Sequence, residues 1–530
     1  MDASEILAEL LTPEGRENPY PHYAASHELG DVLPLGDGLW LVPGYEAINQ
    51  TLRSSAFGPW DDRYPRPFTS DEWKLHPSVA SLTHSILDTN PPDHTRMRDV
   101  LARAFTARRV AALEPMIAQL TSELLDSMAE AGKDGASFDF MDLFAFRLSV
   151  GVVCELFGMP REDWPKFRKL GADWTEVFEV APTEESTVIA DAAYLQFEEY
   201  FTDLVAKRRA DPGDDLVSAV VQITDRENAP LTAEELVCNL AVVLAAGYET
   251  ATHLFGNGLN LLFQYPEVAA GLRAKELAMD NFVEEILRFD SPVQLIARVS
   301  REDGAEIAGA QVPPGEWAVL MLGAGNRDPA RYTDPDRFDP TRTSIQPVSL
   351  GAGIHHCLGA PLARLEGSIV FAQLLERFPG IAPAGPPTRR DRLTMRGYET
   401  MPVILNGAPP QHQSAASSGQ AQATTAPAAA EEGSAGTIDG TWAISYQPPV
   451  GKEQHADLIL AADGTKMTGT FDGFTIDNGE VHDSEFTYTA NLTAPFKVKV
   501  KCTGSFDGDT MSGKVKAAFM SVSFTGTRKA

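Results

Sequence analysis

The residue of greatest chemical interest is Cys357, which lies in the segment Leu-Gly-Ala-Gly-Ile-His-His-Cys-Leu-Gly-Ala-Pro at residues 350–361. A cysteine thiolate can bind a metal ion, attack a carbonyl group or transfer electrons. Three glycines surround it, at Gly351, Gly353 and Gly359. Because glycine has no Cβ atom, the backbone here can approach a flat ligand closely. These residue types and spacings predict a loop that presents one sulfur atom.

The segment after Cys357 predicts a helix. Pro361 is typical of a first helical turn, and Leu362, Leu365 and Ile369 recur at spacings of three and four. Cys357 then lies just ahead of a helix N-terminus, where unpaired amides and the helix dipole stabilise a thiolate. The sequence has no Cys-x-x-Cys-His motif for covalent haem attachment, and one cysteine cannot form a tetrahedral zinc site. A buried, inert cysteine in a glycine-rich turn is the alternative.

This loop resembles the haem-binding signature of the cytochrome P450 family, in outline Phe-x-x-Gly-x-His/Arg-x-Cys-x-Gly. Leu350 stands where the family usually has phenylalanine. The resemblance implies that Cys357 is the axial iron ligand of a haem b cofactor (iron protoporphyrin IX). The residues that match the signature, and that the resemblance assigns to cofactor binding, are Gly351, Gly353, His355, Cys357 and Gly359.

A second candidate site is an acid next to a threonine inside a long apolar segment. A capping box at Thr232-Ala-Glu-Glu predicts the start of a helix that continues to Leu262. Glu249 and Thr250 conflict with simple packing in such a helix, and conflicts of this kind mark functional sites. A threonine that bonds back to the preceding turn is the structural alternative.

The segment Ala246–Thr252 resembles the family's Ala/Gly-Gly-x-Asp/Glu-Thr element. The resemblance implies that this helix passes over the oxygen-binding face of the haem, and that Glu249 and Thr250 deliver protons there. Ala251 stands where many members have a second hydroxyl residue, so Thr252 is the reserve candidate.

Cationic residues at three further places match haem-binding positions of the family. His94 and Arg98 lie four residues apart, on one face of a predicted helix, where two donors suit a carboxylate. An exposed basic helix surface is the alternative reading. The resemblance implies that His94, Arg98, Arg298 and His355 bind the haem propionates. Pro347 replaces a histidine that is common before the haem loop.

Glu285 and Arg288 are spaced to form an ion pair on one helix face. Alone, this spacing is weak evidence. The pair resembles the family's Glu-x-x-Arg element, and the resemblance implies that Arg342, in Phe-Asp-Pro-Thr-Arg, completes a structural ion-pair network on the haem side of the core.

Residues 58–87, rich in aromatics and prolines, predict a long surface loop, which by resemblance covers the substrate pocket. Aromatic residues at helical spacing, such as Trp174, are more often simple core. The substrate-pocket candidates are Leu87, Trp174, Phe178, Leu244, Val293, Ile296 and Thr400.

The resemblance implies a monooxygenase that inserts one atom of O2 into an apolar small molecule by hydroxylation or epoxidation. The chain has no flavin or iron–sulfur motif of its own, so we expect a separate ferredoxin and ferredoxin reductase as electron source. A basic patch for the donor is expected from Arg103, Arg108, Arg109 and Arg364. A peroxide-using or isomerising haem-thiolate enzyme, and a haem-based sensor whose tail recruits a partner, are the alternatives.

The chain divides into three predicted regions, and the first of them contains these residues. The resemblance covers residues 1–406 and implies the mainly α cytochrome P450 fold with a minor β-sheet. Residues 407–437, rich in Ala, Ser, Gln and Pro, predict a flexible linker. Residues 438–530 show period-two alternation, which predicts an all-β antiparallel barrel or sandwich of roughly eight strands. Hairpin turns are predicted at Asp463-Gly464, Asp472-Gly473, Asn478-Gly479 and Asp507-Gly508. Its Gly-Thr-Trp opening, at residues 440–442, is similar to that of lipocalins.

Composition limits the partners and the compartment. The 530 residues carry a formal charge of −30, which disfavours nucleic acid and anionic membranes as partners. We expect no secretory signal, because the first ten residues are acidic, and no membrane span, because the most apolar stretch, residues 240–247, is short. Four widely spaced cysteines suit a reducing compartment, so the expected location is the cytoplasm.

Overall fold

The computed structural model describes residues 1–60, 73–179, 182–226, 230–406, 438–446, 454–471, 474–482, 484–492, 498–517 and 520–529. The chain divides into two compact units. The first, called the helical unit here, contains Met1–Ala3 and Glu14–Pro410; the second, the barrel unit, contains Ser4–Pro13 and Gln411–Ala530. The predicted linker at residues 407–437 lies outside the described residues.

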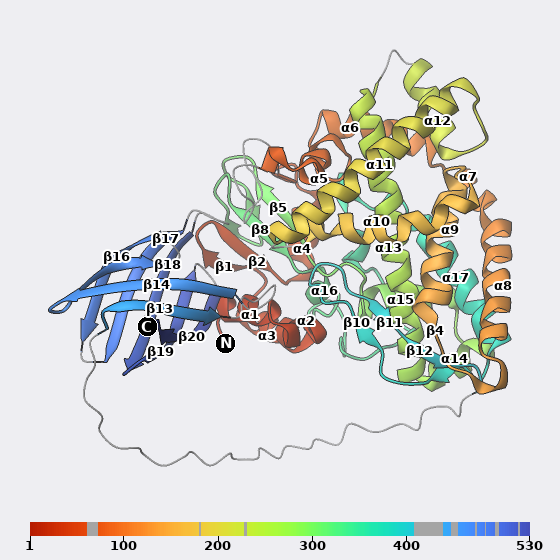
Figure 1. Ribbon diagram of the computed structural model, residues 1–530. Coiled ribbons are helices and arrows are strands. Elements are labelled where there is room, and N and C mark those ends of the chain that lie inside the picture. The colour runs from red at the N-terminus through yellow and green to blue at the C-terminus, as the bar shows by residue number, and fades with distance from the viewer. Residues whose placement is uncertain are drawn as a thin grey trace. The chain divides into compact units, whose positions relative to one another are not determined.

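Helices dominate the helical unit, as expected (Figure 1). Within the described residues, those that matter for the site or enclose it are α4 (Tyr45–Arg53), α5 (Pro77–Ala80), α6 (Asp93–Ala104), α7 (Ala107–Ala112), α8 (Glu114–Ala131), α9 (Phe146–Leu156), α10 (Trp164–Trp174), the 3₁₀ helix η6 (Thr175–Phe178), α11 (Glu184–Ala210), α12 (Leu216–Arg226), α13 (Ala233–Gln264), α14 (Pro266–Arg273), α15 (Met279–Phe289), α16 (Leu322–Gly325) and α17 (Ala360–Arg377). Near the N-terminus lie α1 (Ala3–Leu10), α2 (Pro13–Glu17) and α3 (Tyr20–Leu29).

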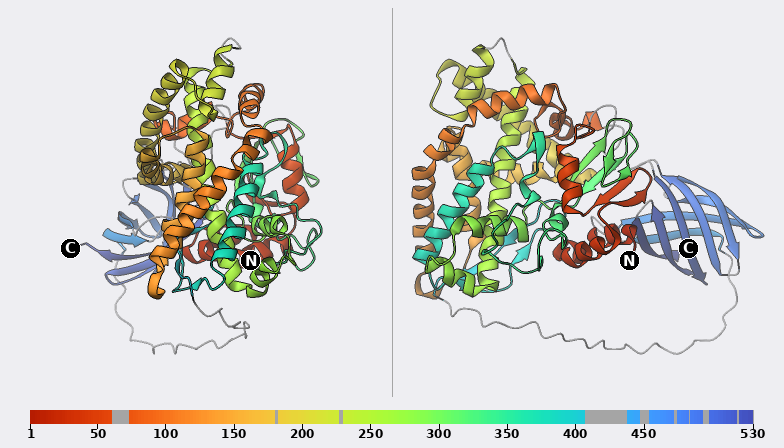
Figure 2. Two further views of the ribbon diagram at one scale, coloured as in Figure 1. Left: turned by 90° about the vertical axis from the view of Figure 1, so that its right-hand side faces the viewer. Right: turned by 180° about the vertical axis from the view of Figure 1, so that it is seen from behind.

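Helix α13 is the central element of this unit. Its N-terminus has the predicted capping box, in which the Glu235 amide donates to Thr232 Oγ1 at 3.1 Å and the Thr232 amide donates to a Glu235 carboxylate oxygen at 2.8 Å. The helix is apolar on nearly all sides, which is the pattern of a helix buried within a unit. Helices α8 and α17 lie side by side elsewhere in the unit (Figure 2).

The minor sheet of the helical unit has the strand order β1-β2-β8-β5-β3. Its strands are β1 (Leu33–Gly36), β2 (Leu39–Val42), β3 (Phe57–Gly58), β5 (Ile296–Ser300) and β8 (Trp317–Leu320), and β2 pairs with β8 in parallel. Short strands form the remaining ladders: β4 (Phe138–Asp139), β6 (Glu306–Ile307), β7 (Ala310–Gln311), β9 (Ala382–Pro383), β10 (Thr388–Arg389), β11 (Tyr398–Thr400) and β12 (Pro402–Ile404).

The predicted β domain is a closed barrel of eight antiparallel strands in sequential order. The strands are β13 (Gly440–Tyr446), β14 (Gln454–Asp463), β15 (Lys466–Phe471), β16 (Phe474–His482), β17 (Glu485–Leu492), β18 (Val498–Asp507), β19 (Thr510–Ala517) and β20 (Met520–Arg528). Alternate positions point into an apolar interior that includes Trp442, Phe486 and Tyr488. The indole of Trp442 donates to the Ile438 carbonyl at 2.9 Å, which satisfies the polar atom of this buried ring.

Three local expectations meet different outcomes in the barrel. Asp463-Gly464 and Asp507-Gly508 form turns between strands, with both glycines at positive φ, as predicted. Asn478-Gly479 lies inside β16 instead, where the ladder register shifts, so the prediction of a turn there is wrong. A β-bulge accommodates the same left-handed Asn conformation, φ 48°, that a hairpin turn uses. Asp472-Gly473 lies outside the described residues.

Two expectations for the first 90 residues also differ from the structure. The stretch predicted as a loop contains short helical turns at Trp73–Leu75, Pro77–Ala80 and Ser81–His84. These turns are too short to show a helical period in the sequence. Residues Ser4–Pro13, which hold most of α1, belong to the barrel unit rather than to the helical unit. No helix in the described ranges is long and apolar enough to cross a membrane.

Candidate active site

Cys357 lies in the predicted loop, two residues before Gly359, which is the N-cap residue of α17. Its amide donates to the Leu350 carbonyl at 2.8 Å, which closes the loop. Burial raises the pKa of the Cys357 thiol, while the amides of Gly359 and Ala360 and the charges of Arg98 and Arg364 oppose that rise. The sulfur therefore has backbone donors at a helix start, as expected for a sulfur that binds a metal as the thiolate.

The glycines of this loop have separate structural reasons. Gly351 and Gly353 adopt positive φ values of 68° and 66°. A Cβ atom on Gly353 would lie 2.2 Å from the Leu52 carbonyl oxygen, so this glycine lets the loop approach the backbone of α4 rather than a ligand. A Cβ atom on Gly359 would lie 3.9 Å from the Cys357 sulfur, in ordinary contact. Our expectation that all three glycines make room for a flat ligand is therefore incorrect for Gly353.

The residues expected to bind propionates come together from three elements. The rings of His94, on α6, and His355, in the cysteine loop, lie 4.2 Å apart between centroids. Burial and the neighbouring Arg98 and Arg298 lower the pKa of His94 to about 4. Burial likewise lowers the pKa of His355 to about 2, with Arg298 as the next cause. Both imidazoles are neutral at pH 7, and the two guanidinium groups supply the positive charge.

Unsatisfied polar atoms in this cluster fit an anionic cofactor. The Nε2 atoms of His94 and His355 are buried without a hydrogen-bond partner in the structure. The guanidinium of Arg98 donates to the His356 carbonyl at 2.6 Å, and that of Arg298 donates to the Ala297 carbonyl at 2.8 Å. Buried polar atoms of this kind normally have partners. The carboxylate groups of haem propionates would accept hydrogen bonds from the two guanidinium groups and from an imidazole N–H, so the residues present fit a haem.

Helix α13 has one open face in an otherwise buried surface. Gly247 is exposed, and Val243, Ala246 and Thr250 are half-buried, at positions three or four residues apart. The Thr250 hydroxyl donates to the Ala246 carbonyl at 2.8 Å, which is the back-bond named above as the structural alternative. This bond uses the hydroxyl proton and leaves the oxygen lone pairs of Thr250 available on the open face.

Thr252 has a different environment. Its side chain is buried, and its hydroxyl donates to the Tyr248 carbonyl at 2.8 Å. Two residues along an α-helix correspond to a rotation of roughly 200°. Thr252 therefore does not share the open face with Thr250, and the structure gives the reserve candidate no access to it.

Glu249 is buried in a cluster of charged residues that sequence reasoning missed. Its carboxylate forms a very short ion pair with Arg390 and lies 3.7 Å from Arg392 Nη1 and 3.6 Å from His253 Nε2. Burial would raise the pKa of Glu249, but His253 and the two arginines hold it at about 2. The carboxylate is therefore ionised at neutral pH.

A signal for this cluster exists in the sequence. Arginines stand at 389, 390, 392 and 396, within eight residues of an acidic chain. Their partners are on other elements, however, and only the fold separates them into two groups. Arg389 and Arg396 bind Asp290, at 3.1 and 2.8 Å, whereas Arg390 and Arg392 face Glu249.

The expected ion-pair network is assembled in the core. Arg288 and Glu285 are both fully buried and form two hydrogen bonds of 2.7 Å. Arg288 also donates to the carbonyls of Asn326, Pro335 and Arg337. Arg342 lies 3.4 Å from a Glu285 oxygen, as the resemblance implied. The network connects α15 to residues 326–342, the segment that precedes the cysteine loop.

The candidates for the substrate pocket fall into two groups. Trp174 and Leu244 are fully buried, and Trp174 packs against Phe178, Tyr194 and Phe197. They belong to the core of this structure and border no open space. The candidates that retain exposed surface are Leu87, Phe178, Val293, Ile296 and Thr400.

The expected basic patch is partly neutralised within the chain. Arg103 pairs with Asp99 at 3.0 Å, Arg109 lies 3.8 Å from Asp214, and Arg364 forms a very short ion pair with Glu284. Arg108 is exposed. Exposed pairs of this kind contribute little to stability and rearrange easily.

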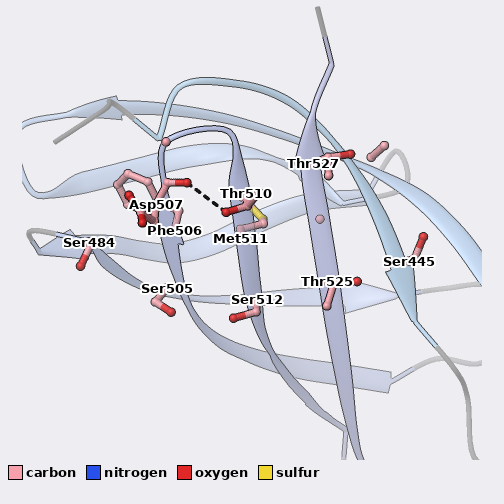
Figure 3. A pocket seen from close by; sticks show the side chains of 13 residues that line it. Ser445, Ser484, Ser505, Phe506, Asp507, Thr510, Met511, Ser512, Thr525 and Thr527 are labelled. Carbon is pink, nitrogen blue, oxygen red and sulfur yellow. Dashed lines mark hydrogen bonds between the residues drawn. The ribbon is translucent and has the colours of Figure 1, made fainter. Parts of the chain in front are cut away.

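The barrel unit has an open pocket of about 890 Å³ on its wall (Figure 3). Most of its lining side chains are hydroxyl residues of β13, β18, β19 and β20, such as Ser445, Ser512 and Thr525. Ser445 is 2.8 Å from His455 Nδ1, an ordinary cross-strand hydrogen bond on an exposed surface. In the described residues, no group of three or more His, Cys, Asp or Glu side chains is arranged to hold a metal ion.

A glycine-rich cysteine loop beside a cluster of two histidines and two arginines is the arrangement expected of a haem-thiolate protein. The sequence profile of the cytochrome P450 family matches residues 60–397, and the chain belongs to that family. It is 36% identical over 369 residues to the cytochrome P450 monooxygenase PikC of Streptomyces venezuelae, covering 69% of this chain and 85% of that protein. It is 35% identical over 399 residues to 6-deoxyerythronolide B hydroxylase of Saccharopolyspora erythraea, covering 73% and 96%.

Further relatives support the class of enzyme. Vitamin D(3) 25-hydroxylase of Pseudonocardia autotrophica is 35% identical over 398 residues, covering 73% of this chain and 94% of the hydroxylase. Among solved structures, P450BioI in complex with an acyl carrier protein ligated to hexadec-9Z-enoic acid superimposes with a TM-score of 0.68 and 31% identity, covering 74% of this chain and 99% of that chain. The protein is therefore a haem-containing monooxygenase of the oxidoreductase class, with an additional C-terminal barrel.

Proposed function

We propose that this P450 uses haem b to insert one oxygen atom of O2 into an apolar small molecule, by hydroxylation or epoxidation. The observation that carries the proposal is the pairing of Thr250, on the open face of α13, with the ionised Glu249 one residue earlier. A haem with a thiolate ligand supplies oxygen binding and O–O bond cleavage when it is bound. Cys357 is the proposed ligand, and His94, Arg98, Arg298 and His355 are the proposed propionate partners.

Proton delivery is the proposed task of Thr250 and Glu249. The open face of α13 has apolar neighbours, such as Val243 and Ala246, that exclude bulk water. Because the Thr250 proton is bonded to Ala246, its oxygen accepts a hydrogen bond from an ordered water on that face. Glu249, as a carboxylate, accepts hydrogen bonds from waters that connect this ordered water to the solvent side. Such positioned groups typically contribute about a hundredfold or more to the rate.

We propose that electrons come from a separate ferredoxin and its reductase in the cytoplasm. All four cysteines are free, which agrees with a reducing compartment. Ile354, in the cysteine loop, is 53% exposed and offers an apolar contact near Cys357 for a protein partner. Arg108 and the paired arginines around it supply charge that attracts an acidic donor.

The substrate class is proposed from the pocket and the relatives. Leu87, Phe178, Val293 and Ile296 give the pocket edge an apolar character. Polyketide lactones, secosteroids and fatty acids are the first compounds to screen, because the names of the relatives point to these classes. A spectral shift of the ferric haem on binding identifies ligands without the need for turnover.

The decisive experiment measures the ratio of product formed to reductant consumed, with a ligand found in that screen. Thr250→Ala is expected to keep reductant consumption largely intact but to divert it to peroxide, because the hydroxyl oxygen that orients the ordered water on the open face is lost. Thr252→Ala serves as the matched control and should behave as wild type, since its hydroxyl is buried. Unchanged coupling in Thr250→Ala, or turnover with peroxide alone, would favour the peroxide-using alternative.

A further inference from the structure

Arg392 lies between two carboxylates on different elements. Its side chain is only 9% exposed. Nη1 lies 3.7 Å from the Glu249 carboxylate on α13, and Nη2 forms a very short ion pair with Glu176 on η6. One guanidinium group thus neutralises part of the charge on both acids. Any change in its contact with one acid alters the charge that it presents to the other.

The segment that carries Arg392 is attached to the corner formed by α10 and η6. Arg392 donates to the Ala172 carbonyl at 2.8 Å and to Thr175 Oγ1 at 2.9 Å. The amides of the next two residues, Leu393 and Thr394, donate to the Glu179 carboxylate at 3.1 and 3.0 Å. The position of Arg392 is therefore determined mainly by this corner, and only secondarily by Glu249.

The same corner contributes to the substrate-pocket candidates. Phe178, the last residue of η6, keeps exposed surface, whereas Trp174 and Val177 anchor the corner in the core. Glu249 lies next to Thr250 on α13. Arg392 consequently joins the corner at the edge of the proposed pocket, through hydrogen bonds, to the proposed proton-delivery pair, through its ion pair with Glu249.

We propose that Arg392 is a positioning residue that couples the α10–η6 corner to Glu249. The proposal rests on the proton-delivery role proposed above. Glu176 and Glu249 share the positive charge of Arg392. Because of this sharing, the Glu249 carboxylate is held mainly by Arg390 and His253. When the Glu176 contact is lost, the Arg392 charge is no longer shared with Glu176, and the Glu249 carboxylate is held more tightly. Arg392 itself does not touch the reacting atoms.

The first test uses hydrogen exchange, since coupling between two sites is reciprocal. Exchange is measured in the haem-loaded full chain, in peptides that cover residues 172–179. In Glu249→Gln, Arg392 keeps only its partners at the corner, and exchange there should slow about fivefold. In Arg392→Gln, exchange should become faster by a similar factor. Thr250→Ala, which does not touch Arg392, is the control, and it should match wild type.

The second test changes a half-buried acid at the corner to its amide. Glu176→Gln removes the ion pair of Arg392 with Glu176, keeps its hydrogen bond to Thr175 and does not touch Glu249. Reductant consumption is measured in H2O and in D2O, with a plant-type ferredoxin and its reductase as surrogate donors. The H2O/D2O rate ratio should rise at least about twofold over wild type, because proton delivery becomes slower. Asp173→Asn, which breaks only the Lys169 pair on α10, is the matched control and should keep the wild-type ratio.

Two results would overturn the coupling: corner exchange in Glu249→Gln equal to that of wild type, or equal isotope ratios in Glu176→Gln and Asp173→Asn. If proton delivery by Thr250 and Glu249 is wrong, the pattern of isotope ratios across the variants is different. If Thr250→Ala also leaves the isotope ratio at the wild-type value, proton delivery by this pair is wrong. The exchange measurement then still decides whether Arg392 links the corner to Glu249.

Discussion

At the scale of single residues, Cys357 has the properties of a metal ligand and not of a structural cysteine. Cys154, Cys238 and Cys502 are fully buried, whereas Cys357 keeps partial exposure and has amide donors around its sulfur. Iron bound at this site favours the thiolate, since metal binding deprotonates a coordinating thiol. These contrasts come from the loop and the start of α17.

Cys357→His is expected to abolish the long-wavelength absorption band of the reduced carbon monoxide complex, because that band depends on a thiolate ligand to the haem iron. The measurement is an absorption difference spectrum of the reduced protein with and without carbon monoxide. Cys502→Ser, in the barrel, is the control and should keep the band. Retention of the band in Cys357→His would show that another residue binds the iron.

Arg98→Ala combined with Arg298→Ala is expected to release haem readily. Each charge-assisted hydrogen bond contributes about 1.5–3 kcal/mol, so the pair lowers haem affinity by two orders of magnitude or more. Haem transfer to an apo-myoglobin acceptor measures the loss. Arg108→Ala, which removes an exposed arginine, should retain haem as wild type does. A double variant with wild-type retention would mean that the propionates bind elsewhere.

At the scale of elements, the ion pair of Glu285 and Arg288 joins α15 to the segment before the cysteine loop. Both side chains are fully buried, and three backbone carbonyls depend on Arg288. A buried ion pair contributes little relative to an apolar pair, yet removing one partner leaves a buried charge uncompensated. Its loss should therefore affect the stability of the helical unit rather than chemistry.

Glu285→Gln is expected to lower the free energy of unfolding of the helical unit by about 3–5 kcal/mol. Denaturant unfolding, followed by haem absorption, measures the change. Glu399→Gln breaks the more exposed pair with Arg390, and it should change stability by no more than about 1 kcal/mol. Equal stabilities of the two variants would contradict a structural role for the buried network.

At the scale of the whole molecule, the two compact units do not coincide with the two ends of the chain. Residues Ser4–Pro13 belong to the barrel unit, although they precede the helical unit in sequence. Their apolar side chains Ile6, Leu7 and Leu10 are between 0 and 2% exposed. A chain that lacks the C-terminal barrel therefore keeps the apolar helix α1 without the rest of its unit.

A chain of residues 14–406 is expected to remain monomeric and to bind haem, because the site residues all lie in the helical unit. A chain of residues 1–406 should bind haem but associate, since the apolar face of α1 becomes exposed. Light scattering after size exclusion and the carbon monoxide spectrum test both expectations. If residues 14–406 lose affinity for a ligand that the full chain binds, the barrel unit takes part in substrate binding.

The sequence by itself determined what depends on local spacing. The cysteine loop, the capping box at Thr232 and the alternation in the barrel strands all predict their structures, because turn chemistry, helix capping and strand period are properties of neighbouring residues. The resemblance also brought Arg288 and Arg342 to Glu285, and both contacts are present in the structure. Asn478-Gly479 shows the limit of local signals, since a bulge and a hairpin turn use the same backbone conformation.

Only the tertiary structure decided which distant groups meet. Arg390 and Arg392 lie more than 140 residues from Glu249, and no local pattern predicts that they hold its charge. The fold likewise separated Thr250 from Thr252, because the packing of α13 leaves one face open and buries the other. The need for Gly353 comes from the approach of α4, which is remote in sequence. Contacts between elements depend on how their surfaces pack, and spacing along the chain does not contain that information.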